Sequence, residues 1–187
     1  MYERDRSEAR RLDGRRVAYQ FDAERDIPWQ ELSRPGRHMP VGFLAEAGLA
    51  APELGPEAAD LVDWAFALSI CETFVALEQV ILRFLEREQA ALPPSRSIAW
   101  MIEEEAKHIR LFERYGAHLR TRRRREDGEL FDRAFARERA ALDQFDDPAD
   151  RYPSLAACHY VFWLSVLFFE EYSIFLDDRL DREAGVC

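Results

Sequence analysis

Glu105 and His108 are the two residues whose types and spacing point most directly to metal chemistry. They lie three positions apart in a stretch that is typical of a helix, so both side chains leave one face about a turn apart. The same face carries apolar residues, namely Ile98, Met101, Ile102, Ile109 and Phe112. A carboxylate in such surroundings is costly unless a partner compensates its charge. A Glu-x-x-His pair that faces a helical core is therefore a candidate part of a metal site.

Two further segments offer carboxylates at core positions. Glu78 lies in a wholly apolar stripe and is the first candidate there, with Glu72 as the reserve. Glu170 and Glu171 are adjacent within a strongly apolar segment, so at least one of them must point toward buried surroundings. One of these two is the expected third carboxylate ligand, and spacing does not decide which. Carboxylate oxygens with an imidazole nitrogen suit ferrous or manganous ions.

Four segments have the periodicity and the boundaries of helices that could position these residues. They are expected at about residues 56–89, from residue 95 or 97 to 122, at 128–145 and at 154–180. Proline pairs and Asp-Pro steps separate them, and the short linkers predict antiparallel neighbours in an all-α bundle. With a turn near residue 92, Glu78 lies 14 residues before it and Glu105 lies 13 after it. The two carboxylates should therefore reach the same height, with Glu72 roughly 9 Å away along the axis.

The first 55 residues show little periodicity and contain several prolines and glycines. They predict an extended N-terminal arm that wraps the bundle formed by residues 56–187. The most apolar run, residues 155–169, contains His159 and Ser165 and is followed at once by two glutamates. A membrane span needs about 20 apolar residues. A central core helix is therefore the prediction for this run.

Composition narrows the partners and the compartment. The chain has 187 residues, a net charge of −10 and 48% apolar residues, which predicts a folded domain and disfavours nucleic acid and anionic membranes as partners. The one basic run, residues 122–125, is expected to be a solvated helix end rather than the nucleic-acid patch of a regulator. Three widely spaced cysteines predict a reducing, cytoplasmic location.

Several stretches together resemble a known family. They are residues 21–29, 74–78 (Phe-Val-Ala-Leu-Glu), 104–109 (Glu-Glu-Ala-Lys-His-Ile) with Phe112, and 169–172 (Phe-Glu-Glu-Tyr). With these the chain resembles the ferritin-like superfamily, and specifically the p-aminobenzoate N-oxygenase type of di-iron oxygenase. The resemblance implies two irons, dioxygen, an electron donor and oxidation of an aromatic amine or a related small organic substrate.

The residues expected to hold iron are thus Glu78, Glu105, His108 and Glu170 or Glu171. Aromatic residues near them are candidates for a substrate pocket, although each could equally be plain core: Trp100, Phe162, Trp163 and Phe168. Glu104 and Tyr172 are candidates for hydrogen bonds to the ligands, and Tyr172 could instead simply pack.

The sequence departs from this family at its C-terminal end. Members of the family carry a further helix with a second Glu-x-x-His and an additional histidine, whereas here only 16 residues follow Glu171 and none is histidine. We expect a shortened version of a longer enzyme, a site completed by a second chain, or a degenerate relative that binds one metal or none. The alternative function is a non-catalytic bundle that acts through oligomerisation, because uncovered apolar faces favour homo-oligomers.

Overall fold

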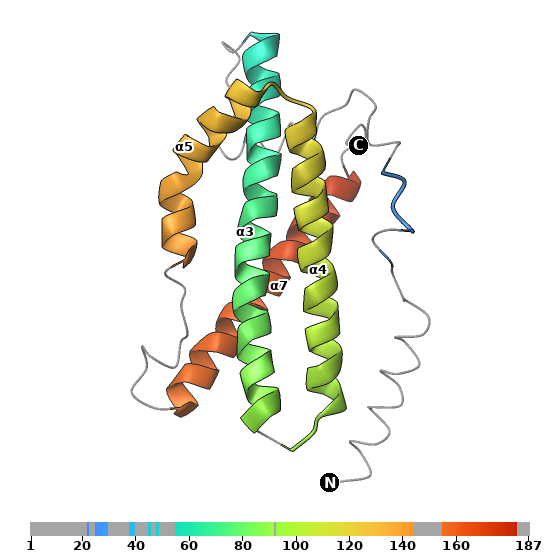
Figure 1. Cartoon of the computed structure of the whole chain (residues 1–187), viewed down its shortest axis with the longest axis vertical. Coiled ribbons are helices and arrows are strands. Elements are labelled where there is room, and N and C mark those ends of the chain that lie inside the picture. The colour runs from blue at the N-terminus through green and yellow to red at the C-terminus, as the bar shows by residue number, and fades with distance from the viewer. Residues whose placement is uncertain are drawn as a thin grey trace.

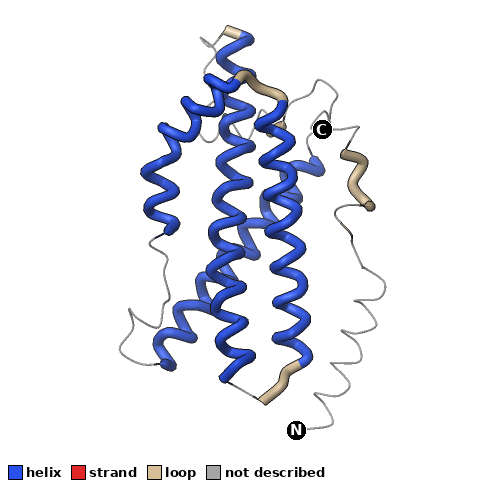
Figure 2. The backbone as a smooth tube through the Cα atoms, viewed as in Figure 1, coloured by secondary structure: helices blue, strands red, loops and turns tan. Residues whose placement is uncertain are grey.

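The computed structural model of this protein describes residues 22, 25–29, 38–39, 45, 48, 55–91, 93–143 and 155–182, of which residues 142–143, 155–159 and 174–182 are described by their backbone alone. Within these ranges the chain forms four helices and no strand (Figure 1 and Figure 2). They are α3 (Pro56–Ala91), α4 (Arg96–Thr121), α5 (Arg125–Asp143) and α7 (Leu155–Arg182). Successive helices run in opposite directions. The all-α prediction is confirmed, and each helix begins and ends within three residues of its expected limits.

Local sequence explains where α4 begins and ends. Ser95 adopts an extended conformation after two prolines, and its side chain accepts a hydrogen bond from the backbone N–H of Ile98 at 3.4 Å. At the other end α4 stops at Thr121, so residues 122–124 form the link to α5 and Arg125 is the first residue of α5. Arg122, Arg124 and Arg125 are exposed, as expected of a solvated helix end, but the run follows α4 and begins α5 rather than forming the last turn of α4. The acidic first turn of α5, with Glu126 and Asp127, favours this earlier start.

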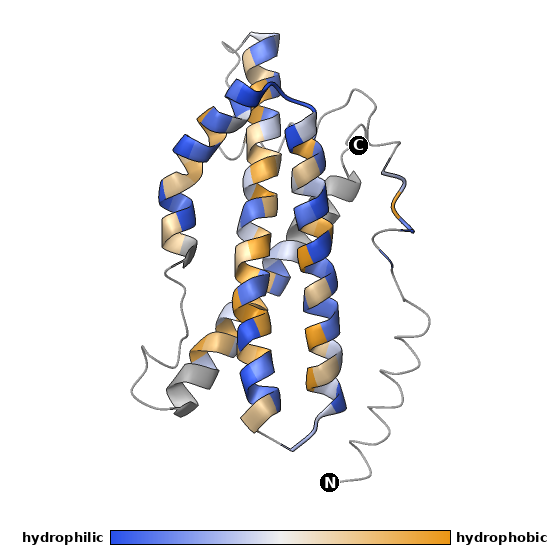
Figure 3. Cartoon of the chain, in the orientation of Figure 1, coloured by the Kyte–Doolittle hydropathy of each residue, from blue (hydrophilic) through white to orange (hydrophobic). Residues whose placement is uncertain are grey.

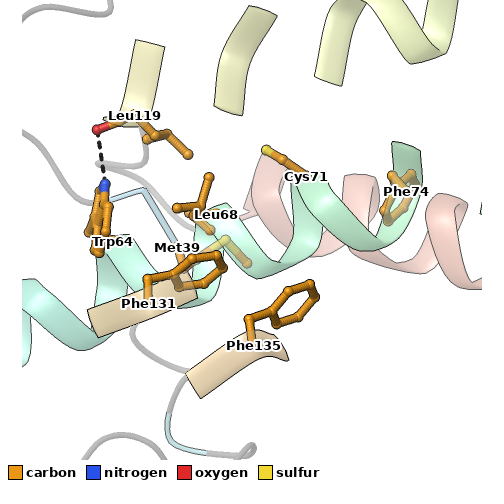
Figure 4. Packing of buried hydrophobic residues seen from close by; sticks show 9 residues of the cluster. Met39, Trp64, Leu68, Cys71, Phe74, Leu119, Phe131 and Phe135 are labelled. Carbon is orange, nitrogen blue, oxygen red and sulfur yellow. Dashed lines mark hydrogen bonds between the residues drawn. The ribbon is translucent and has the colours of Figure 1, made fainter. Parts of the chain in front are cut away.

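The upper part of the hairpin between α3 and α4 is held by an aromatic and aliphatic core that also anchors α5 (Figure 4). Trp64 is 1% exposed, and its indole N–H donates to the backbone carbonyl of Leu119 at 2.9 Å. The ring of Phe131 from α5 meets Trp64 edge to face at 5.9 Å between centroids. One side chain of α3 thus contacts both neighbouring helices.

Ion pairs join the same three helices. Arg120 of α4 donates to Glu72 of α3 at 2.8 Å and to Asp132 of α5 at 2.9 Å, and Arg139 of α5 donates to Glu72 at 2.9 Å. These side chains are half-buried, so solvent screens the network only in part. The network fixes α5 beside α3.

α7 crosses α3 and α4 obliquely (Figure 1). Its inner face packs on α3, with Phe162 stacked on Phe84 at 3.6 Å and Phe169 tilted against Phe74 at 4.8 Å between centroids. The outer face remains exposed, although it is largely apolar: Tyr160, Trp163, Leu164, Leu167, Phe168 and Tyr172 are between 37% and 70% exposed. The prediction of a central core helix is wrong for this outer face, because a helix that crosses one side of a hairpin is covered by it on one side only.

Among the described residues, one helix, α3, is long and apolar enough to cross a membrane by length and composition, and 33% of its apolar window is buried. Hydrophobic residues follow α3 along much of its length (Figure 3). The core helix of a soluble protein has the same composition, so this is weak support for a span. The cytoplasmic location stays a prediction.

Most of the expected arm, residues 1–55, lies outside the described residues. The described part contacts the hairpin at several points. The buried carboxylate of Asp63 accepts hydrogen bonds from the backbone N–H groups of His38 and Met39, each at 2.8 Å. The guanidinium of Arg114 lies over the ring of Trp29 at 4.5 Å.

Candidate metal centre

The structure brings Glu78, Glu105 and His108 together on facing sides of α3 and α4. One potential ligand atom from each residue lies within 4.8 Å of the others. His108 Nδ1 is 3.3 Å from Glu78 Oε1 and 3.5 Å from Glu105 Oε2. Glu78 and Glu105 meet because they are nearly equidistant from the turn between the two helices. Helical spacing then brings His108 to the same level, one turn after Glu105.

Burial separates the two carboxylates from the imidazole. Glu78 is 2% exposed and Glu105 is 5% exposed, whereas the His108 side chain is 43% exposed. His108 therefore does not point fully into the core, as its apolar neighbours suggested, but lies at the edge of the contact between α3 and α4. The Oε2 atoms of both glutamates are buried and have no hydrogen-bond partner. Two carboxylate oxygens without partners are costly in such a place unless a proton or a cation compensates them.

These surroundings change the protonation of all three groups. Burial raises the pKa of Glu78 to about 8, against the opposing effect of His108. Contacts with Glu105 and Glu78 raise the pKa of His108 to about 10. Burial also acts to raise the pKa of Glu105, but His108 and Glu78 outweigh it and the pKa is lowered. Without a metal the cluster therefore retains protons near neutral pH.

Two of the three separations between donor atoms also suit one divalent cation. Donors about 2.1 Å from an ion lie roughly 3.0 to 3.4 Å apart in octahedral or tetrahedral arrangements. The two distances from His108 Nδ1, 3.3 and 3.5 Å, are close to that range. Two carboxylates and one imidazole suit Fe²⁺ or Mn²⁺, and the negative charge of the glutamates would offset the charge of the ion.

Glu170 and Glu171 differ in their relation to this cluster. The pKa of Glu170 is raised, first by partial burial and then by the negative charge of Glu105, while His108 acts in the opposite direction. Glu170 thus experiences the charges of the cluster, although it is not part of the group that lies within 4.8 Å. Both Glu170 and Glu171 are exposed, so the expectation that one of them points into buried surroundings is wrong. Glu171 leaves α7 about 100° further round. The raised pKa of Glu170, to which Glu105 contributes, makes it the better candidate of the two, and the choice of ligand stays a prediction.

The reserve ligand Glu72 is occupied elsewhere, in the ion pairs with Arg120 and Arg139. Glu104, a candidate for supporting the ligands, pairs with Lys107 at 2.7 Å. Tyr172, the other such candidate, is 44% exposed on the outer part of α7.

The predicted pocket aromatics differ in burial and in their neighbours. Phe162 is buried against Phe84, and Trp163 packs edge to face on Phe162 at 5.2 Å while remaining 41% exposed. Phe168 is 68% exposed. Trp100 is half-buried, and its indole N–H is buried without a hydrogen-bond partner. The substrate pocket expected from these four residues stays a prediction.

A pocket of about 230 Å³ lies in the groove between α3 and α4. Its lining is mainly small or apolar with charged residues among it: Cys71, Glu72, Val75, Phe112, Glu113, Gly116, Ala117 and Arg120. Phe112 follows His108 by one turn and Val75 precedes Glu78 by one turn, so the pocket begins about one turn from the cluster. Sequence reasoning missed it, although Gly116 and Ala117 were a signal, because small residues on a helix leave space beside a neighbour.

The remaining described histidines lie apart from the cluster. His38 is near the hydroxyl of Tyr115, at 3.5 Å from Nδ1, and burial lowers its pKa. His118 Nε2 is buried without a hydrogen-bond partner. The side chain of His159 lies outside the described residues.

Comparison with known proteins found no match: no family model, no curated protein and no solved structure matches this chain. The assignment to the ferritin-like superfamily therefore stays a prediction, which depends on the sequence resemblance.

Proposed function

We propose that this chain is a ferritin-like, non-haem iron oxygenase that uses dioxygen to oxidise a small organic substrate, an aromatic amine or a related molecule. The observation that carries the proposal is the cluster of Glu78, Glu105 and His108, in which two buried carboxylates have oxygen atoms without partners. Compensation by a divalent cation explains why such costly groups face one another. The sequence resemblance adds the identity of the metal and the type of reaction.

The residues of the chain have distinct roles in this proposal. Glu78, Glu105 and His108 would hold iron, which when bound supplies the electrons that activate dioxygen. Because these groups bind protons in the metal-free cluster, loading must release those protons. The neighbouring rings of Phe74 and Phe112, 4.6 Å apart, limit the access of water from the core side. The half-exposed side of His108 leaves a path by which small molecules reach the centre.

The number of ions is a separate question from their presence. Three donors are sufficient for one ion with open positions, and Glu170 adds a carboxylate nearby. Two irons would need further ligands from outside the described residues or from another chain. Manganese is the alternative metal, because the same donors suit it.

The test is metal content of the full chain, purified without oxygen and loaded with ferrous iron, and measured by elemental analysis. We expect at least one iron per chain, and loss of it in Glu105→Gln and His108→Ala. Glu72→Gln is the matched control, since it removes a carboxylate of α3 that pairs with arginines rather than with the cluster. Iron that is absent from the unaltered chain, or retained by both cluster variants, contradicts the proposal.

Activity needs its own measurement, since a bound ion is not an oxygenase. Uptake of dioxygen by the iron-loaded chain, given a reductant and an aromatic amine, should exceed that of the Glu105→Gln variant, with an oxidised amine as the product. If the chain binds iron but takes up no dioxygen, the metal site is supported and the oxygenase activity is contradicted.

A second candidate function is a non-catalytic helical bundle that acts by association. The apolar outer face of α7 favours it, because exposed patches of this kind mark interaction surfaces. Iron content distinguishes the two: an assembled but iron-free protein would support this second function.

A further inference from the structure

The outer face of α7 concentrates exposed apolar surface. Of the large hydrophobic residues that are exposed in the described part of the chain, all but Leu130 belong to α7. With aromatic side chains of about 150 to 250 Å² each, their exposed fractions amount to roughly 600 Å². The largest apolar patch on a typical monomer is about 300 to 600 Å² and is often functional. The apolar area of this face is thus as large as the largest apolar patch on a typical monomer.

α7 presents little polar surface to water in its described middle, where Ser165 lies among exposed apolar residues. Phe162 and Val166 are buried against α3, while Leu164, Leu167 and Phe168 point the other way and are exposed. A helix that is apolar all round is ordinarily buried all round. Among the described residues, a packing partner is therefore present for the inner half of α7 and not for its outer half.

The spacing on the outer face matches helix-to-helix packing. Tyr160, Leu164, Leu167 and Glu171 follow one another at intervals of four, three and four residues. This is the spacing of the contact positions in a coiled coil, and Trp163 flanks the line on one side. The spacing of these residues therefore suits packing against another helix.

We propose that the occupant is α7 of a second copy of this chain, packed antiparallel about a twofold axis. Two faces of roughly 600 Å² would bury about 1,200 Å², which reaches the lower limit for a specific interface. A twofold contact uses the same patch on both subunits, so it needs no second apolar surface, and the described residues offer none.

The direction of packing follows from charge and register. An antiparallel pair centred between Leu164 and Leu167 sets Leu164 against the partner subunit's Leu167. The same register sets Trp163 against the partner subunit's Phe168. It also sets the Tyr160 hydroxyl against the partner subunit's Glu171, whose carboxylate can accept a hydrogen bond from it. A parallel pair would instead place the two Glu171 carboxylates side by side, which is unfavourable. The interface goes beyond the proposed metal function and does not depend on it.

The experiment is sedimentation equilibrium of the full chain without metal. The unaltered chain should be a dimer at micromolar concentrations, and Leu164→Asp and Leu167→Asp should shift it to monomer. Leu130→Asp is the matched control: it places the same charge at an exposed leucine, 50% accessible, on α5 and should remain dimeric. Circular dichroism should give equal helix content in all variants, because each altered side chain is exposed in the single subunit.

Glu171→Gln tests the register. In the antiparallel pair it removes a charged acceptor from Tyr160 and should weaken dimerisation several-fold, whereas in a parallel pair it would remove repulsion and strengthen it. A stronger dimer overturns the antiparallel register. A monomeric unaltered chain, or a dimer that persists in both aspartate variants, overturns the interface. Binding of that monomer to phosphatidylcholine vesicles would assign the face to lipid instead.

Discussion

Glu78 and His108 carry protons in the folded, metal-free cluster that they would release in the unfolded chain. The pKa of Glu78 rises from 4.5 to about 8, and that of His108 from 6.5 to about 10. In both cases the folded state binds more protons across the interval, so stability falls as pH rises. The lowered pKa of Glu105 acts in the opposite direction, and its contribution is lost only as pH falls below its ordinary value of 4.5.

We therefore predict that the metal-free protein unfolds more easily at about pH 9 than at about pH 6. Urea unfolding at both values measures this, and Glu78→Gln should reduce the difference because it removes one of the two titrating groups. Equal stability at the two values, or greater stability at the higher pH, would contradict the assigned protonation. Metal affinity should show the reverse trend and increase with pH, since the ion replaces the protons.

Trp64 illustrates how much one buried residue contributes outside the site. It is 1% exposed, donates to the Leu119 carbonyl and contacts Phe131. We predict that Trp64→Ala lowers the free energy of unfolding by about 3 to 5 kcal/mol. Trp64→Phe keeps most of the ring but leaves the carbonyl without its donor, and should cost less. Chemical denaturation checks both, and a loss well below 1 kcal/mol for the alanine variant would show that this contact is unimportant.

At the scale of the elements, the position of α5 depends on ion pairs as well as on the core. Glu72 accepts from Arg120 and Arg139, and Arg120 also pairs with Asp132. Isolated surface pairs contribute about 0.2 to 1 kcal/mol, and a half-buried network should lie at the upper end. We predict that Glu72→Gln lowers the free energy of unfolding by about 1 kcal/mol.

Salt provides the check on that prediction. The effect of Glu72→Gln should diminish at about 1 M sodium chloride, where the screening length is about 3 Å. Arg125→Gln is a suitable control, because Arg125 pairs only within α5, with Glu129 at 2.7 Å, among the contacts described for it. An effect of Glu72→Gln that is independent of salt would indicate packing rather than charge.

For the whole molecule, the cluster joins α3 and α4, the two helices that contact each other most extensively, between their ends. An ion that binds only the folded state stabilises it, by about 2.7 kcal/mol at a hundredfold excess over its dissociation constant. We predict that ferrous iron raises the melting temperature of the unaltered chain and that a chelator reverses the rise. Calorimetry measures it, and Glu105→Gln, which lacks one of the ligands, should not respond. A rise that persists in this variant would place the ion elsewhere.

Much of this arrangement is already determined by the sequence. Helical periodicity and the proline breaks define four helices to within three residues, because these signals act over a few neighbouring residues. Equal distances from the turn place Glu78 level with Glu105, and helical geometry adds His108. These inferences use only the constant rise per residue of an α-helix and the short linker between α3 and α4. Both are local properties of the chain.

Only the tertiary structure decided how the elements meet. It packs Phe162 and Phe169 of α7 against α3, because the crossing of α7 selects which side faces inward. It also places Glu72 among arginines that are 48 and 67 residues away in sequence. The half-exposed His108, the open face of α7 and the pocket beside Gly116 follow in the same way. Each depends on the distances and angles between packed helices, and a periodic pattern along one helix contains no information about either.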